Sequence, residues 1–211
     1  MKLFYYIFTF WILSIVPAFS QVDFGIKAGG AYSSLTQRVH DDYISGGRFG
    51  FNVAGIMDAH IYKGLSFRPE VAFVNQGGSY YSQYNNPITN KHNSYSYYSI
   101  QVPLNIAYTF HLSDVSFSVF AGPSLDFSLF GKMKTNSDPE STNITFGKKE
   151  ENDLKTFDLG VNLGISVEYN KFFFAINSIT GTLDRRSIKH EGESNLFQNN
   201  VSFSLGYFFR K

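Results

Sequence analysis

From Phe24 to the end of the chain, one pattern recurs: about ten residues in which apolar side chains alternate with small or polar ones. Between Phe157 and Val167 every second residue is apolar, and the residues between are Asp158, Gly160, Asn162, Gly164 and Ser166. Successive side chains of a β-strand point to opposite faces, so each such segment predicts a strand with one apolar and one polar face.

Eight segments carry this pattern, clearly in seven and less clearly at 172–183. They lie at residues 23–33, 47–61, 65–77, 97–110, 115–130, from about 156, 172–183 and 200–210. The apolar face of a soluble sheet needs a second layer, and no helical pattern is present to supply one. The fold class predicted is therefore all-β: a single eight-stranded antiparallel transmembrane β-barrel with its apolar face toward lipid.

The connections alternate between short and long. Short turns are expected at 62–64, 111–114 and 170–171, and long polar loops at 35–46, 79–96, 131–155 and 184–199. This rhythm is typical of barrels with short periplasmic turns and longer extracellular loops. It predicts four long extracellular loops and both termini in the periplasm.

The first twenty residues have the parts of a secretory signal peptide. A positive start at Lys2 precedes an apolar run over 3–16, and small residues precede Gln21. We expect cleavage before Gln21, which leaves residues 21–211 as one barrel domain in the cell outer membrane. The alternative, an uncleaved anchor, needs a span of about 20 apolar residues, and this run is shorter.

Composition narrows the remaining classes. A formal net charge of +1 gives no electrostatic reason to expect a nucleic acid partner. Cysteine is absent, which excludes disulfides and thiolate metal sites. Aromatic residues reach 18%, with 23 Phe and 14 Tyr, an abundance that two aromatic girdles at membrane interfaces would use.

Five short segments resemble the PorT-like outer-membrane β-barrel family of Gram-negative bacteria. They are FGIKAG from Phe24, RPEV from Arg68, QVPL from Gln101, FAGP from Phe120 and LGYFF from Leu205. The resemblance implies an eight-stranded barrel inserted by the barrel-assembly machinery. It implies little about activity. The founding member is linked to secretion and maturation of surface proteases, but no motif carries that role onto this chain, so the role is kept as an alternative. One departure is that Arg210 and Lys211 follow Phe209, where the family pattern ends on an aromatic residue.

The polar face of the predicted strands carries seven charged residues, which we expect inside the barrel. An eight-stranded barrel has an interior just wide enough for side chains to fill, and buried charges need partners. We therefore expect a plug of paired charges; the alternative is a polar conduit or ligand cavity. The cluster comprises Lys27, Arg48, Arg68, Glu70, Asp126, Asp158 and Glu168.

Tyrosines bracket the second long loop. Exposed tyrosine is common in recognition sites, which makes this region a candidate recognition surface, with an ordinary aromatic girdle as the alternative. The candidates are Tyr80, Tyr81, Tyr84 and Tyr95.

No catalytic, metal or cofactor site is expected. Ser33 and Ser34 lie near His40 and Asp41 in sequence, but no Gly-x-Ser-x-Gly elbow is present. The acidic stretches at 138–140 and 150–153 lack the spacing of a calcium loop. We expect neither an enzyme nor a cofactor.

These features favour a non-enzymatic integral outer-membrane protein that is structural or binds through its extracellular loops. One alternative is an accessory component of a secretion or surface-assembly system. Another is a soluble periplasmic lipocalin-like carrier, which requires the apolar parity to point inward. The expected partners are outer-membrane lipid, the barrel-assembly machinery during biogenesis, and an unknown extracellular or envelope partner.

Overall fold

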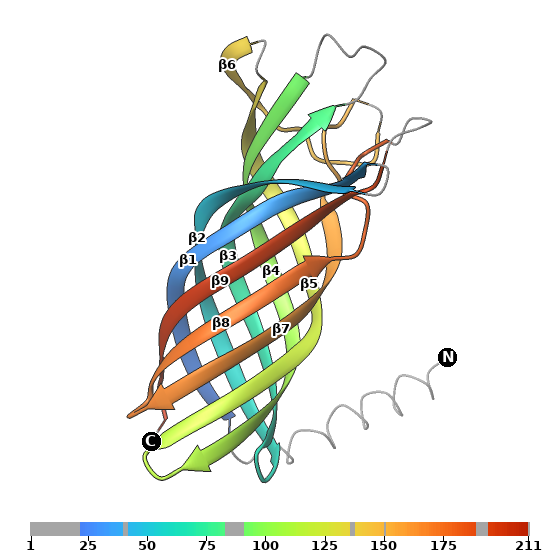
Figure 1. Cartoon of the computed structure of the whole chain (residues 1–211). Coiled ribbons are helices and arrows are strands. Elements are labelled where there is room, and N and C mark those ends of the chain that lie inside the picture. Colours follow the sequence, from blue (N-terminus) through green and yellow to red (C-terminus); the bar gives the residue numbers. More distant parts are fainter. Residues whose placement is uncertain are drawn as a thin grey trace, which may run out of the picture.

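A closed antiparallel β-barrel forms the protein (Figure 1). The computed structural model describes residues 22–39, 42–82, 91–135, 138–149, 151–188 and 194–210. Within them the strands are β1 (Val22–Val39), β2 (Asp42–Tyr62), β3 (Leu65–Ser82), β4 (Lys91–Leu112), β5 (Val115–Thr135), β6 (Asp138–Asn143), β7 (Phe157–Tyr169), β8 (Phe172–Gly181) and β9 (Leu196–Phe208).

The strand order closes the sheet on itself. Neighbours follow the order β4-β3-β2-β1-β9-β8-β7-β5, and β4 also pairs with β5. The eight-stranded prediction is therefore confirmed. The short strand β6 is additional and pairs with the far end of β5, from Lys132 to Thr135. No helix in the described ranges is long and apolar enough to cross a membrane.

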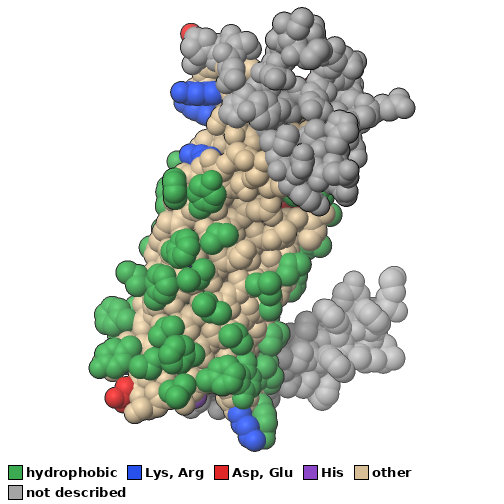
Figure 2. All heavy atoms as spheres, in the orientation of Figure 1, with side chains coloured by type: hydrophobic (Ala, Val, Ile, Leu, Met, Phe, Trp, Pro, Cys, Tyr) green, Lys and Arg blue, Asp and Glu red, His purple; other side chains and the backbone are tan. Residues whose placement is uncertain are grey.

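The apolar parity of the strands faces outward. Phe49 is 81% exposed and Leu205 is 70% exposed, whereas the neighbouring polar positions Asn52 and Ser204 are buried. Figure 2 shows many of these apolar side chains on the visible face of the barrel wall. A lipocalin-like carrier needs the opposite orientation.

Aromatic side chains gather at both edges of the band that these outward-facing apolar side chains form. One group lies near the short turns and includes Tyr62, Phe110, Tyr169, Phe172 and Phe209; the other includes Tyr32, Phe49, Phe51, Phe73, Tyr98 and Phe130. On β2, Phe51 and Ile61 are ten residues apart, which at ~3.3 Å per residue and a tilt of ~45° gives ~23 Å along the barrel axis. This matches the ~25 Å apolar band of outer-membrane barrels.

The three predicted short turns all lie at one end, called here the short-turn end. Lys63, Ser113, Asn170 and Lys171 have positive φ angles of 49°, 54°, 48° and 72°, as tight hairpin turns require. The C-terminus lies at the same end (Figure 1). The opposite end is called the long-loop end.

The strands extend further at the long-loop end than the sequence predicts. The β1–β2 ladder continues to the pair Val39–Asp42, so most of the first expected loop, 35–46, is a hairpin. The apolar alternation stops here because this part lies beyond the apolar band. The backbone pairing nevertheless continues. The barrel wall is uneven, since β7, β8 and β9 have only 13, 10 and 13 residues.

A bulge interrupts the β4–β5 ladder. Tyr98 pairs with Phe130 and Ser99 with Ser128, which leaves Leu129 without a partner in β4. One extra residue reverses the side-chain parity of everything after it. Even-numbered residues of β5 point inward up to Ser128 and outward from Phe130.

Candidate functional site

The polar faces of all eight strands line the barrel interior. Five of the seven predicted interior charges are at most 7% exposed: Lys27, Arg68, Glu70, Asp126 and Asp158. Arg48 and Glu168 are half-buried on the same face. The structure does not bring the seven together in one cluster, because they lie at different heights along the barrel.

At the short-turn end, Arg210 joins three strands through their carboxylates. Its Nε lies 3.0 Å from Asp23 Oδ2 on β1, its Nη2 3.0 Å from Asp58 Oδ2 on β2, and its Nη1 3.0 Å from Glu168 Oε1 on β7. We call these four residues the C-terminal clasp. The guanidinium also lies 4.3 Å from the ring centroid of Phe208.

Sequence reasoning missed the clasp. Arg210 stood out only as a departure from the usual aromatic end, and Asp58 was not among the predicted interior charges. Asp58 is fully buried and its Oδ2 also accepts a hydrogen bond from Arg68 Nη2 at 2.8 Å. The even position of Arg210, the same parity as the inward Ser202 and Ser204, is the signal that could have indicated it.

A second ion pair lies in the middle of the barrel. Lys27 Nζ is 2.6 Å from Glu70 Oε2, and both side chains are almost fully buried. Amide and hydroxyl groups fill the same region: Asn162 donates to Asn105 Oδ1 at 2.8 Å, and Ser204 donates to Asn52 Oδ1 at 3.0 Å.

Nearer the long-loop end, Gln76 is the centre of an amide network. Its Nε2 donates to Asp126 Oδ2 at 2.8 Å and to Ser99 Oγ at 2.9 Å, and its Oε1 accepts from Gln101 Nε2 at 3.1 Å. Arg48 donates to Asn75 Oδ1 at 3.0 Å and to the carbonyl of Gln76 at 3.1 Å. A cavity of about 10 Å³ beside Asp126 has room for about one water molecule.

Arg185 enters this interior from the connection between β8 and β9. Its side chain is fully buried, its Nη2 donates to Ser128 Oγ at 2.7 Å, and its guanidinium lies 5.7 Å from the ring centroid of Tyr97. Burial acts to lower the pKa of Arg185, but neighbouring side chains, including the carboxylates of Asp126 and Asp158, outweigh it and raise the pKa overall. The guanidinium therefore stays charged, in a position that the sequence assigned to an extracellular loop.

Apolar side chains cover this network at the long-loop end. We call the group the apolar cap: Leu35, Tyr95, Tyr97, Ile144, Leu154 and Leu196, with Met133 and Phe146 packed against it. The hydroxyl of Tyr97 donates to Gln198 Oε1 at 2.6 Å, which ties the cap to the polar layer below.

The cap corrects one predicted recognition residue. Tyr95 is only 3% exposed, because it lies on the inward parity of β4, so it cannot belong to an exposed surface. The backbones of Tyr80 and Tyr81 belong to β3, but their side chains, and the whole of Tyr84, lie outside the described residues.

The interior offers no arrangement suited to catalysis in the described ranges. Ser33 is fully buried and its Oγ accepts a hydrogen bond from the Gly77 amide at 2.9 Å, while His40 and Asp41 lie outside the described residues. His111 Nδ1 lies 2.8 Å from Ser116 Oγ at the short-turn end, but among the described residues it has no carboxylate partner to orient it.

The acidic loop stretches show no metal site either. Asp153 Oδ2 accepts hydrogen bonds from the amide and hydroxyl of Thr145 at 2.7 and 2.8 Å. Within the described part of the chain, no group of three or more metal-binding side chains comes together.

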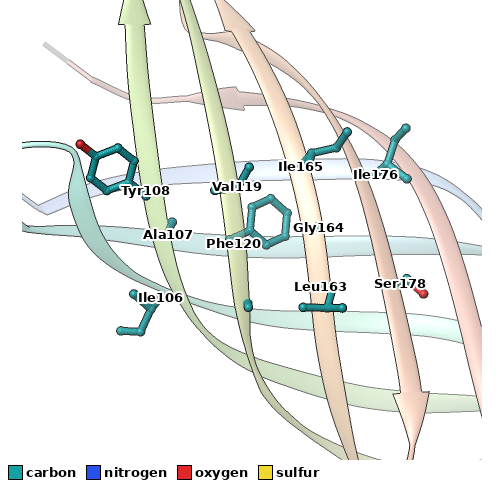
Figure 3. Close-up of a pocket in the computed structure, with 11 residues that line it drawn as sticks. Ile106, Ala107, Tyr108, Val119, Phe120, Leu163, Gly164, Ile165, Ile176 and Ser178 are labelled. Carbon is teal, nitrogen blue, oxygen red and sulfur yellow. The ribbon is translucent and has the colours of Figure 1, made fainter.

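On the outer wall, a depression of about 520 Å³ crosses β4, β5, β7 and β8. Figure 3 shows Ile106, Tyr108, Val119, Leu163, Ile165 and Ile176 around it, with Ser178 at one side. The lining is apolar and lies within the band described above.

Comparison with known proteins assigns the family. Residues 19–184 match the model of the outer membrane protein beta-barrel domain. No curated protein sequence matches the chain.

Several solved structures share the general form at low identity. Neisserial surface protein A is 12% identical, with 89% of this chain and 99% of that chain covered and a TM-score of 0.49. Ail of Yersinia pestis, solved with the heparin analogue sucrose octasulfate, is 12% identical, with coverage of 90% and 99% and a TM-score of 0.46. The outer membrane enzyme PagL is 8% identical, with coverage of 84% and 98% and a TM-score of 0.45.

Proposed function

The chain belongs to the outer membrane protein beta-barrel domain family, and from that membership we propose a non-enzymatic integral outer-membrane protein that binds an envelope or extracellular partner through its long-loop end. In this proposal, residues 1–20 are a cleaved signal peptide, the short-turn end faces the periplasm, and the interior carries no flow of solute. The observation that supports it best is the succession of the C-terminal clasp, the Lys27–Glu70 pair and the apolar cap along the barrel axis.

The buried side chains of the described interior support a binding role over transport. A conduit needs a continuous polar path wide enough for solvent, and the cavity beside Asp126 holds about one water molecule. The apolar cap also places Leu154 and Leu196, both fully buried, across the mouth at the long-loop end.

The uneven rim is the part of the molecule suited to specific contacts. Strands β1 to β5 have 18 to 22 residues, so they rise above the band and carry polar residues such as Ser45 and Ser94 on their exposed face. Tyr80 and Tyr81 lie at the far end of β3 on this taller side, and Tyr84 follows them in the sequence, outside the described residues. We propose that this side carries the recognition surface.

The direct experiment is a quantitative pull-down from native outer membranes. The full chain is compared with a variant in which 83–90 is replaced by a short Gly-Ser turn, and with a control in which the turn at 113–114 is replaced. We expect partners that the first replacement removes and the control retains. An unchanged set of partners in all three would exclude recognition through this loop.

The same experiment separates a second candidate, an accessory role in a secretion or surface-assembly system. Only the five family-like segments support it, and four of them lie within strands of the barrel wall that any member needs. Secretion components as the main partners would favour this role over adhesion or structural support.

A further inference from the structure

A groove of about 550 Å³ lies on the outside of the barrel at the long-loop end. It is formed where β4, β5 and the end of β6 meet, and its lining includes Ser96, Tyr98, Leu129, Phe130, Lys132 and Asn143. It is separate from the interior and from the depression in the middle of the apolar band.

The groove has an apolar and a polar half. Its apolar half continues the aromatic girdle, since the ring of Tyr98 lies 4.9 Å from that of Phe130 and stacks on Phe73 at 5.4 Å. Its polar half contains Lys132 beside the Ser96 position with which it pairs across the ladder. An apolar floor below a cation at the girdle is the arrangement that suits a lipid lying along the barrel wall.

The bulge at Leu129 is what turns Lys132, which lines the groove, and Lys134, two residues further on the same strand face, to the outside of the barrel. Without the extra residue, the parity that buries Asp126 and Ser128 would continue and would point Lys132 and Lys134 into the barrel. With it, both lysines are exposed and Met133 packs inward against the apolar cap. Figure 2 shows basic side chains above the apolar band at this end of the molecule.

Among the described residues, these two cations differ from the interior ones in having no ion-pair or hydrogen-bond partner. Lys27, Arg68, Arg185 and Arg210 all have hydrogen-bonding or ionic partners, whereas Lys132 and Lys134 have no ion pair or hydrogen bond within the described ranges. Two exposed ammonium groups on the same strand face, two residues apart, repel each other, so an anion beside them is favoured.

We propose that this groove binds a phosphorylated glycolipid of the outer leaflet, with its phosphate between Lys132 and Lys134 and its hydrocarbon along Tyr98 and Phe130. A phosphate monoester on a sugar carries ~−1.5 to −2 charge at neutral pH. A zwitterionic phospholipid instead brings its own ammonium, which these lysines repel. The proposal rests on the proposed orientation, in which the long-loop end faces outward.

The test is native mass spectrometry of delipidated, refolded protein with added lipid. The probes are diphosphorylated lipid A, the same lipid without phosphates, and phosphatidylethanolamine. We expect lipid A adducts on the wild-type protein that fall about tenfold in the Lys132→Gln/Lys134→Gln variant, since two interfacial ion pairs are lost. Lys132→Arg/Lys134→Arg keeps the charge and should retain the adducts.

The matched control is Lys148→Gln/Lys149→Gln, which removes two exposed lysines from the connection after β6 and should leave the adducts unchanged. Equal adducts in the Lys132/Lys134 glutamine variant, equal binding of dephosphorylated lipid or phosphatidylethanolamine, or full displacement by inorganic phosphate would each overturn the proposal. The measurement uses neither membrane orientation nor a protein partner, so its outcome is distinguishable from failure of the proposed function.

Discussion

Arg210 shows how a single residue can fasten the ends of a barrel. Its guanidinium reaches carboxylates on β1, β2 and β7, so one side chain restrains strands from both halves of the chain. In the sequence, Arg210 is an exception to a terminal aromatic pattern. In the structure, it forms the ion pairs of the C-terminal clasp. Side-chain alternation over the predicted strand 200–210 puts Arg210 on the polar parity, but alternation alone could not show which carboxylates its guanidinium would reach.

Replacing Arg210 with Ala should destabilise the barrel by about 2–4 kcal/mol, because it leaves the buried carboxylate of Asp58 with one cation fewer. The temperature at which the folded band converts to the unfolded band in a detergent gel measures this. Lys63→Gln, at an exposed turn of the same end, is the control and should not move it. An unchanged transition temperature in Arg210→Ala would show that the C-terminal clasp does not stabilise the barrel.

The Lys27–Glu70 pair gives a sharper residue-scale prediction. Glu70→Gln leaves a buried ammonium without its anion and should cost about 3 kcal/mol. The double change Lys27→Met/Glu70→Leu removes both charges and should cost less than the single change. Urea unfolding followed by circular dichroism compares the stabilities of the two variants. If the double variant were less stable than Glu70→Gln, the unpaired buried ammonium would not be the cause of the destabilisation.

At the scale of elements, the strands were predictable where lipid and interior impose different side chains. The alternation at 157–167 found β7, and all eight barrel strands were found in order. Their far ends were not, because beyond the band the β1–β2 ladder continues without the apolar alternation that marks a strand in the sequence. The inward position of Arg185 was not predicted either, because a connection that folds back into a barrel has no periodic pattern in the sequence.

The β5 bulge makes an element-scale prediction that the chain is well suited to test, because it contains no cysteine. In an otherwise wild-type protein, Lys132→Cys should react rapidly with a polar thiol reagent and Met133→Cys slowly. Deleting Leu129 should reverse this order, because the parity shifts by one residue. The same order with and without Leu129 would show that the bulge does not set the direction of these side chains.

The closed barrel of the whole molecule could be predicted from the sequence. For the barrel interior, the sequence predicted the type of side chain but not its arrangement. The polar parity indicated that charges lie inside, and the seven predicted residues do line the inner face. Their separation into layers depends on strand register and on Arg185 and Arg210, neither of which belongs to a strand. The cap likewise combines residues from β1, β4, β9 and the connections after β5.

Conductance in planar lipid bilayers shows whether the barrel interior is filled from the C-terminal clasp to the apolar cap. The wild-type protein, with insertion verified by its folded band, should show no large, stable, ion-selective steps. A variant lacking residues 144–155 and carrying Arg185→Ala removes much of the cap and the cation below it, and should conduct more than the wild type. Large, stable steps from the wild-type protein would contradict the account.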